Sequence, residues 1–119
     1  MSRIRRDIDF LLDIQDAVGR ALEYTHGMTW EEYLQERKTQ DAVVRNLEVL
    51  GEATKSLSDE FRTRYPSLPW RDMSGTRDRL IHHYFGINQE IVWQIVQQDL
   101  PVLKQQIDQV ISDFPDLGS

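Results

Sequence analysis

Hydrophobic residues recur along most of the chain at the three- and four-residue intervals that are typical of amphipathic helices. The first such segment spans residues 4–24, and a break at His26 and Gly27 follows it. Thr29 and Glu32 then have the spacing of a capping box, in which a hydroxyl and a carboxylate satisfy free backbone amides at a helix start. The pattern therefore predicts one long helix followed by a short one.

Two more helices are predicted in the middle of the chain. The third should run from about Asp41 to just before Ser58, and Ser58 can cap a brief turn. A linker punctuated by prolines follows, because proline disfavours helix in the residue before it. The fourth helix should span residues 70–84, and Gly86 is placed to stop it.

The last predicted helix begins after Asn88, whose side chain can cap it, and extends to residue 111. Pro101 interrupts this segment. Because proline lacks an amide proton and clashes with the preceding turn, we expect a kink or a break, with Asp99 capping the second half. No long stretch alternates like a strand. We therefore expect an all-α protein, an up-and-down bundle of four to five helices in a single domain over residues 1–119.

The composition narrows the environment and the partners. The chain of 119 residues has no cysteine, which excludes disulfides and thiolate metal sites and fits a reducing cytoplasm. The basic start lacks the apolar stretch of a secretory signal, and no run of about 18 apolar residues is present. The net charge of −6 argues against a general nucleic-acid coat protein. We expect a cytoplasmic protein that does not contact membranes.

Positive charge is nevertheless concentrated in one window. Residues 62–83 contain five arginines and two aspartates, which gives this window a net charge of +3. Since the whole chain has a net charge of −6, the residues outside the window carry −9. Such asymmetry arises by chance in short windows, but it can also mark a local anion site. Within this window Arg77, His82 and Tyr84 have the spacing Arg-x4-His-x-Tyr.

The predicted helix fixes how these side chains relate to one another. Arg77 and Tyr84 would share a face, because seven residues complete nearly two turns. His82 would lie about 140° around the axis from Arg77, so the two would meet only through the long arginine or across a dimer. Asp78, four residues before His82, would be its helical neighbour and could orient and charge the imidazole. This geometry favours a dimeric site.

These residue types can cleave RNA without a metal ion or another cofactor. In that reaction the ribose 2′-hydroxyl attacks the adjacent phosphate, which requires proton transfer and stabilisation of negative charge. His82 can exchange protons near neutral pH, since a histidine has an unperturbed pKa of about 6.5. Arg77, permanently charged and forked, can hold phosphate oxygens. A homodimer would supply two histidines, one to accept a proton and one to donate it.

The residues around the motif form several blocks. They are DAVVRNLEVLGEA at 41–53, PWRDMSGTR at 69–77 and HHYFGI at 82–87, continued by residues 92–93 and 99–101. These blocks closely resemble the HepT-like toxins of the HEPN superfamily. The resemblance extends over essentially the whole chain, from the first helix to about residue 111.

The resemblance implies a dimeric helical bundle whose ribonuclease residues are Arg77 and His82. It also implies a toxin paired with a minimal nucleotidyltransferase antitoxin, which would add adenylyl groups to Tyr84 and block the RNA site. Phosphates added beside Arg77 would occupy the anion site and repel RNA. The family commonly has asparagine where this chain has Asp78. We assign Asp78 a supporting role, either weakening RNA binding or favouring the charged form of His82.

Other interpretations stay open. His82 can be an ordinary structural histidine, Arg77 a member of a surface ion pair, and Tyr84 a residue that closes the core. Arg45, Glu48 and Glu52 lie at three- and four-residue steps on the third predicted helix and are expected to form a solvated ion-pair row without a functional role. The alternative function is a non-catalytic helical adaptor that binds and assists a nucleotidyltransferase partner.

Overall fold

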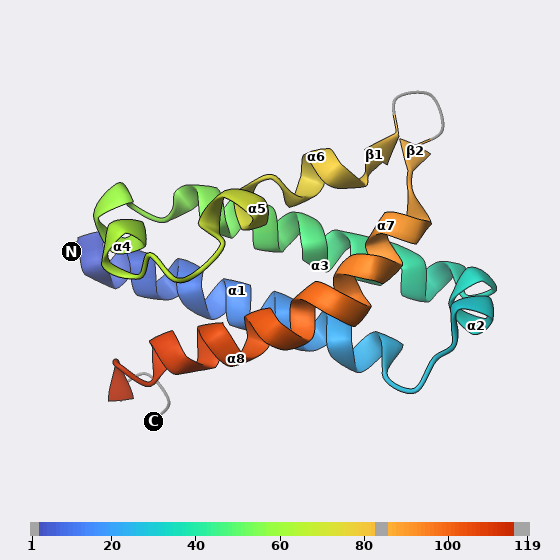
Figure 1. Cartoon of the computed structure of the whole chain (residues 1–119), viewed down its shortest axis with the longest axis horizontal. Coiled ribbons are helices and arrows are strands. Elements are labelled where there is room, and N and C mark those ends of the chain that lie inside the picture. Colours follow the sequence, from blue (N-terminus) through green and yellow to red (C-terminus); the bar gives the residue numbers. More distant parts are fainter. Residues whose placement is uncertain (1–2, 83–85, 116–119) are drawn as a thin grey trace.

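Three long helices form the frame of the molecule (Figure 1). In the computed structural model, which describes residues 3–82 and 86–115, α1 spans Arg3–Thr25, α3 spans Arg37–Ser56 and α8 spans Leu100–Ile111. Helix α1 packs against both α3 and α8. The predicted all-α fold is confirmed, although α3 begins a full turn earlier than the sequence pattern predicts.

Shorter segments connect these helices. They are α2 (Trp30–Leu34), α4 (Asp59–Arg64), α5 (Trp70–Ser74), α6 (Thr76–Leu80), α7 (Gln89–Gln94) and the π-helical segment η1 (Ile95–Asp99), which continues into α8. Two short strands, β1 (Ile81–His82) and β2 (Gly86–Ile87), pair in antiparallel fashion. Of the helices in the described part of the chain, none combines the length and the apolar content that crossing a membrane requires.

Local capping sets several helix starts where the sequence predicts them. The Thr29 hydroxyl accepts a hydrogen bond from the Glu32 amide (3.1 Å), and the Glu32 carboxylate accepts one from the Thr29 amide (3.0 Å). The Ser58 hydroxyl accepts from the Phe61 amide (3.1 Å). Asn88 caps α7 by accepting from two backbone amides, at 3.1 and 3.2 Å. These contacts satisfy amides that a helix start leaves free.

The hydrophobic core lies between α1, α3 and the continuous α7–η1–α8 segment. Its fully buried side chains include Leu11, Ile14, Leu47, Leu50, Val92, Val96, Leu100 and Ile107. Tyr33 of α2 is also fully buried, and its hydroxyl donates to the side-chain oxygen of Gln89. Burial raises the pKa of Tyr33. Its ring packs against Trp93, with ring centroids 5.0 Å apart, so α2 is held onto α7.

The predicted fourth helix over residues 70–84 is wrong at Ile81 and His82, which form β1, and its last two residues lie outside the described residues. The chain forms two short helices that meet at Gly75, and it then becomes extended at Ile81 (φ −86°, ψ 124°). The Asn88 amide donates to the Leu80 carbonyl oxygen (2.8 Å), which closes the strand pair. Gly86 does not stop a helix. It lies in β2 with φ +77°, a conformation that glycine adopts at little cost.

The sequence predicts a kink or a break in the last helix at Pro101, whereas the structure accommodates the proline in a continuous helix. The helix stays continuous through the π-helical turn of Ile95–Asp99, and Pro101 falls in the first turn of α8. The Leu100 amide donates to the Ile95 carbonyl oxygen, five residues back, and this wider turn accommodates a proline that has no amide proton to donate. Asp99 makes no capping hydrogen bond, so its predicted capping role is wrong. Its carboxylate lies 3.5 Å from the Arg79 guanidinium instead.

One buried carboxylate ties the start of α1 to the junction of α3 and α4. Asp7 is 3% exposed. One of its oxygens accepts the Ser58 amide (2.8 Å), and the other accepts the Ser58 hydroxyl (2.7 Å). Buried charge is costly unless it is hydrogen-bonded, so this pair fixes where α4 begins.

Replacing Asp7 with alanine should lower the free energy of unfolding by about 1.5–3 kcal/mol, the range for hydrogen bonds to charged groups. Both Ser58 donors would lose their acceptor. Urea unfolding followed by circular dichroism measures the change. Asp9→Ala removes an exposed carboxylate from the same helix and should change stability by less than about 0.5 kcal/mol. Equal losses in the two variants would contradict the assigned role of Asp7.

Candidate active site

Helix α6 presents its charged residues to solvent because its other side chains are buried. Thr76 and Leu80 are 3% and 0% exposed, whereas Arg77, Asp78 and Arg79 are exposed. The Thr76 hydroxyl is satisfied by the backbone carbonyl of the preceding helix, at 2.8 Å. Packing of these two residues therefore determines that Arg77 faces outward.

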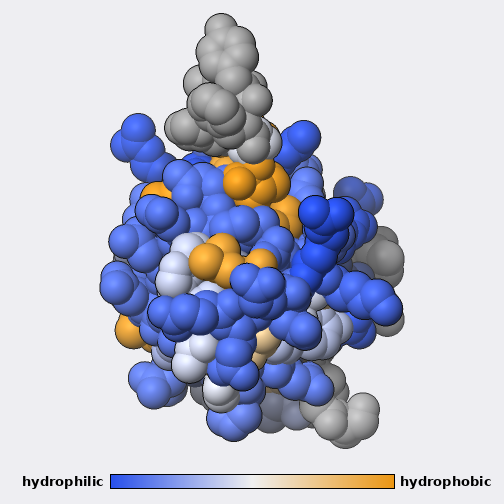
Figure 2. All heavy atoms as spheres, turned by 90° about the vertical axis from the view of Figure 1, so that its right-hand side faces the viewer, coloured by the Kyte–Doolittle hydropathy of each residue, from blue (hydrophilic) through white to orange (hydrophobic). Residues whose placement is uncertain are grey.

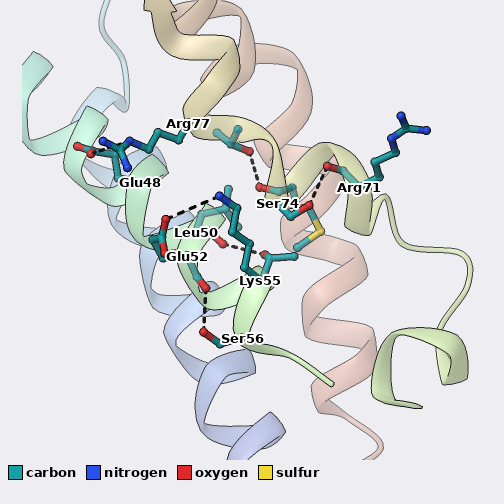
Figure 3. A network of polar contacts seen from close by, with 11 residues as sticks. Glu48, Leu50, Glu52, Lys55, Ser56, Arg71, Ser74 and Arg77 are labelled. Carbon is teal, nitrogen blue, oxygen red and sulfur yellow. Dashed lines mark hydrogen bonds and ion pairs between the residues drawn. The ribbon is translucent and has the colours of Figure 1, made fainter. Parts of the chain in front are cut away.

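Glu48 of α3 is the ion-pair partner of Arg77 (Figure 3). Arg77 Nε lies 4.0 Å from Glu48 Oε2, and the two side chains are 55% and 37% exposed. Solvent screens a pair of this kind, so it adds little to stability. The Arg77 side chain extends toward α3 in this pair, and its guanidinium stays available to another anion.

The predicted ion-pair row along α3 does not form. Glu48 reaches Arg77, and Glu52 lies 3.9 Å from Lys55. Sequence reasoning missed Glu48 because its partner lies on another helix, and spacing along α3 carries no signal for that contact. Glu48 is thus part of the candidate site.

Gly51 allows the chain that bears Arg77 to rest directly on α3. A Cβ atom at Gly51 would lie 3.6 Å from the Met73 carbonyl oxygen, 3.7 Å from the Ser74 carbonyl oxygen and 3.9 Å from the Arg77 amide nitrogen. A Cβ at these distances would make ordinary van der Waals contacts, so the α5–α6 backbone lies very close to α3 at this position. This close packing brings Arg77 within reach of Glu48, three residues before Gly51.

His82 follows α6 in strand β1, where it pairs with Gly86. The predicted helical relation between Arg77 and His82 is wrong, because the helix ends at Leu80. For the same reason Asp78 is not the helical neighbour of His82. The side chain of His82, and Tyr84 as a whole, lie outside the described residues, so their roles remain predictions.

The surface beside this strand pair is partly hydrophobic. In the end-on view of Figure 2 most of the face is hydrophilic, and hydrophobic surface gathers beside the β1–β2 pair. Ile81 and Ile87, which pair across the strands, are 44% and 37% exposed. Two exposed isoleucines thus flank His82 at the sheet.

A groove of about 680 Å³ lies between α5, α6 and the η1–α8 segment. Arg79 and Asp99, which pair with each other, both line it. Leu50, Met73 and Leu103 supply apolar lining. Among residues 3–82 and 86–115, no group of three or more histidine, aspartate or glutamate side chains is placed to hold a metal ion.

Comparisons with known proteins give a consistent result. The family model described as "Ribonuclease HepT-like" matches residues 14–110. A protein of Methanocaldococcus jannaschii named "Putative RNase MJ0127" is 47% identical over 105 residues, which cover 88% of this chain and 87% of the relative. A protein of Thermococcus cleftensis named "Probable ribonuclease HepT" is 40% identical over 102 residues, or 86% and 93% of the two chains. No solved structure matches the chain.

Proposed function

Because the chain belongs to the HepT-like ribonuclease family, we propose that it is a metal-independent endoribonuclease and the toxin of a toxin–antitoxin pair. Arg77 and His82 are the proposed catalytic residues, acting at a cleft between two copies of the chain. The observation that carries the proposal is the exposed and weakly paired guanidinium of Arg77, a short distance along the chain from His82.

The proposed reaction transfers two protons and breaks one P–O bond. One His82 removes the proton of a ribose 2′-hydroxyl, whose oxygen attacks the adjacent phosphorus and forms a cyclic phosphate. A second His82 donates a proton to the departing 5′-oxygen. Arg77 exchanges its screened carboxylate partner for phosphate oxygens and stabilises the additional negative charge. One product therefore ends in the cyclic phosphate, and the other begins with a 5′-hydroxyl group.

The mechanism requires a homodimer, since each chain supplies one motif histidine and the reaction uses an acid and a base. The angular positions of Arg77 and His82 on one helix do not support this requirement, because the helix ends at Leu80. The exposed Ile81 and Ile87 do support it, because a second copy packed beside the strand pair would bury their apolar surface next to His82.

Asp78 keeps a proposed supporting role on different grounds from those of helical spacing. It is exposed beside Arg77 on α6. Its negative charge lowers the local positive potential, so it reduces the attraction of RNA to this site.

We propose that a minimal nucleotidyltransferase antitoxin silences the toxin by adenylylating Tyr84. The phenolic oxygen of Tyr84 would attack the α-phosphate of ATP, and pyrophosphate would leave. The attached phosphate, two residues after His82, would add negative charge close to the motif histidine and repel the RNA backbone.

Arg77→Ala and His82→Ala should each lower the rate of RNA cleavage in EDTA by at least about 100-fold, the scale of lost charge stabilisation or proton transfer. Gel-based cleavage of a labelled RNA measures the rate. His26→Ala, at an exposed histidine before α2, is the control and should cleave like the wild type.

Arg77→Ala should also unfold within about 0.5 kcal/mol of the wild type, because its ion pair is exposed. Loss of activity would then not reflect loss of folding. Undiminished cleavage by His82→Ala would overturn the catalytic role of His82. Absence of cleavage by the wild type itself would favour a non-catalytic adaptor that assists the nucleotidyltransferase.

A heterodimer of one wild-type chain and one His82→Ala chain tests the paired acid and base. If both histidines act in one reaction, its cleavage rate should fall at least about tenfold. Two differently tagged chains allow this species to be purified, and a wild-type/His26→Ala heterodimer is the control. A rate of one half or more would show that the histidines act independently.

Incubation with the antitoxin and ATP should add adenylyl mass to the peptide that contains Tyr84, and RNA cleavage should fall in parallel. Mass spectrometry of the intact protein and its peptides measures the modification. Tyr84→Phe should prevent both effects, whereas Tyr24→Phe, at a tyrosine that is 39% exposed, should not. Adenylyl mass retained in Tyr84→Phe would contradict this target.

A further inference from the structure

A second cationic surface lies next to the candidate site, and the proposed reaction does not use it. It is a hollow of about 460 Å³ between α4 and α5, called here the α4–α5 hollow. Its lining consists of Asp59, Arg62, Thr63, Trp70, Arg71 and Ser74. Two arginines and two hydroxyl-bearing residues therefore line one concave surface.

The α4 side of the hollow is held in place by hydrogen bonds. The Trp70 indole nitrogen donates to the carbonyl oxygens of Arg62 (3.1 Å) and Tyr65 (2.8 Å). Trp70 is 8% exposed, so its ring also anchors α5 in the core. Arg62 is oriented by Asp59, one turn earlier on α4. The hollow is therefore formed before any ligand arrives.

Arg71 differs from the other arginines of the positive window. Arg62, Arg77 and Arg79 each pair with an acidic side chain. Arg64 lies over an aromatic ring, 5.7 Å from the Tyr65 ring centre.

Within residues 3–82 and 86–115, the Arg71 guanidinium has no ion-pair or hydrogen-bond partner, and the side chain is exposed. Figure 3 shows it pointing away from the contacts around Glu48 and Arg77. Its charge is therefore uncompensated by a side-chain partner.

The hollow and Arg77 belong to consecutive short helices, which meet at Gly75. Figure 3 shows the Arg71 and Arg77 side chains on opposite sides of this α5–α6 segment. An RNA strand held at Arg77 reaches Arg71 only by crossing the segment, so the hollow would bind phosphates away from the one that Arg77 holds.

We propose that the α4–α5 hollow is a subsite for the phosphate backbone of the RNA strand, away from the point of cleavage. This inference rests on the proposed ribonuclease function. Arg71 and the free N–H groups of Arg62 bind phosphate oxygens, and the Thr63 hydroxyl donates a further hydrogen bond. The Ser74 hydroxyl already donates to the Arg71 carbonyl oxygen (3.0 Å) and only shapes the surface.

The negative charge outside the positive window favours binding of RNA at this hollow rather than elsewhere on the chain. Outside the positive window the chain carries −9, which repels a phosphate backbone from the remaining surface. Asp59 neutralises one positive charge in the hollow by pairing with Arg62, so Arg71 carries the net attraction. Contacts to phosphate hold a strand in place without reading its bases. The subsite therefore contributes affinity and orientation rather than sequence preference.

Steady-state cleavage by Arg71→Ala tests the subsite with two substrates. On a labelled RNA of about twelve nucleotides, KM should rise at least about tenfold and kcat should change less than about twofold, as expected for one lost charged hydrogen bond away from the reacting atoms. On a dinucleotide too short to reach the hollow, the KM effect should shrink to within about twofold. Arg71→Lys, which keeps the charge, should recover part of the lost affinity.

Arg20→Ala is the matched control, because it removes an exposed arginine from α1. It should cleave both substrates like the wild type. In RNA binding measured with the His82→Ala protein as parent, adding Arg71→Ala should reduce the slope of log affinity against log salt by about 0.7, the value for one single-strand phosphate contact. Adding Arg20→Ala should leave that slope unchanged.

The possible results separate the subsite from the proposed function. If Arg71→Ala and Arg20→Ala give equal KM values on the longer RNA and equal salt slopes, the subsite is wrong and the ribonuclease function stands. If the wild type cleaves neither substrate, the ribonuclease function is wrong. In that case, an unchanged salt slope in Arg71→Ala would overturn the subsite as well.

Discussion

The candidate site depends on the close approach of α3 to the α5–α6 segment at Gly51. Three backbone atoms of that segment lie within 4 Å of the position that a Cβ would occupy. Glu48 lies nearly one turn before Gly51, so this approach brings its carboxylate to Arg77. Burial of Thr76 and Leu80 then orients the charged side of α6 outward. Backbone packing, rather than the ion pair, therefore determines where the candidate catalytic arginine lies.

Local features of the fold could be predicted from the sequence with few errors. The caps at Thr29, Ser58 and Asn88 depend on residues no more than three positions away, so their spacing reveals them directly. Amphipathic periodicity likewise located α1, α3 and the last helix, since burial repeats with the helical turn. The blocks around Arg77 were specific enough to indicate the family, and the family match confirms it.

Features that depend on distant partners could not be predicted in this way. The end of α6 is fixed by a hydrogen bond between Leu80 and Asn88, which no helical pattern encodes. Glu48 appeared to be one of several solvated acids because its partner is on another helix. The sequence does not distinguish Arg71 from the other arginines, because the hollow beside it is formed by residues of two different helices. Contacts between elements depend on tertiary packing, and the spacing of residues along one helix does not reveal which distant residues they meet.

The π-helical segment η1 has a consequence for how the last helix can evolve. Each residue advances a helix by about 100°, so the extra residue in a π turn resets the angular phase of everything after it. With the angular phase that the π turn sets, the core contains Val92 from before the turn and both Leu103 and Ile107 from after it. A relative lacking one residue between α7 and α8 would rotate its last helix by about a quarter turn relative to α1. The length of this segment is therefore as constrained as its hydrophobic content.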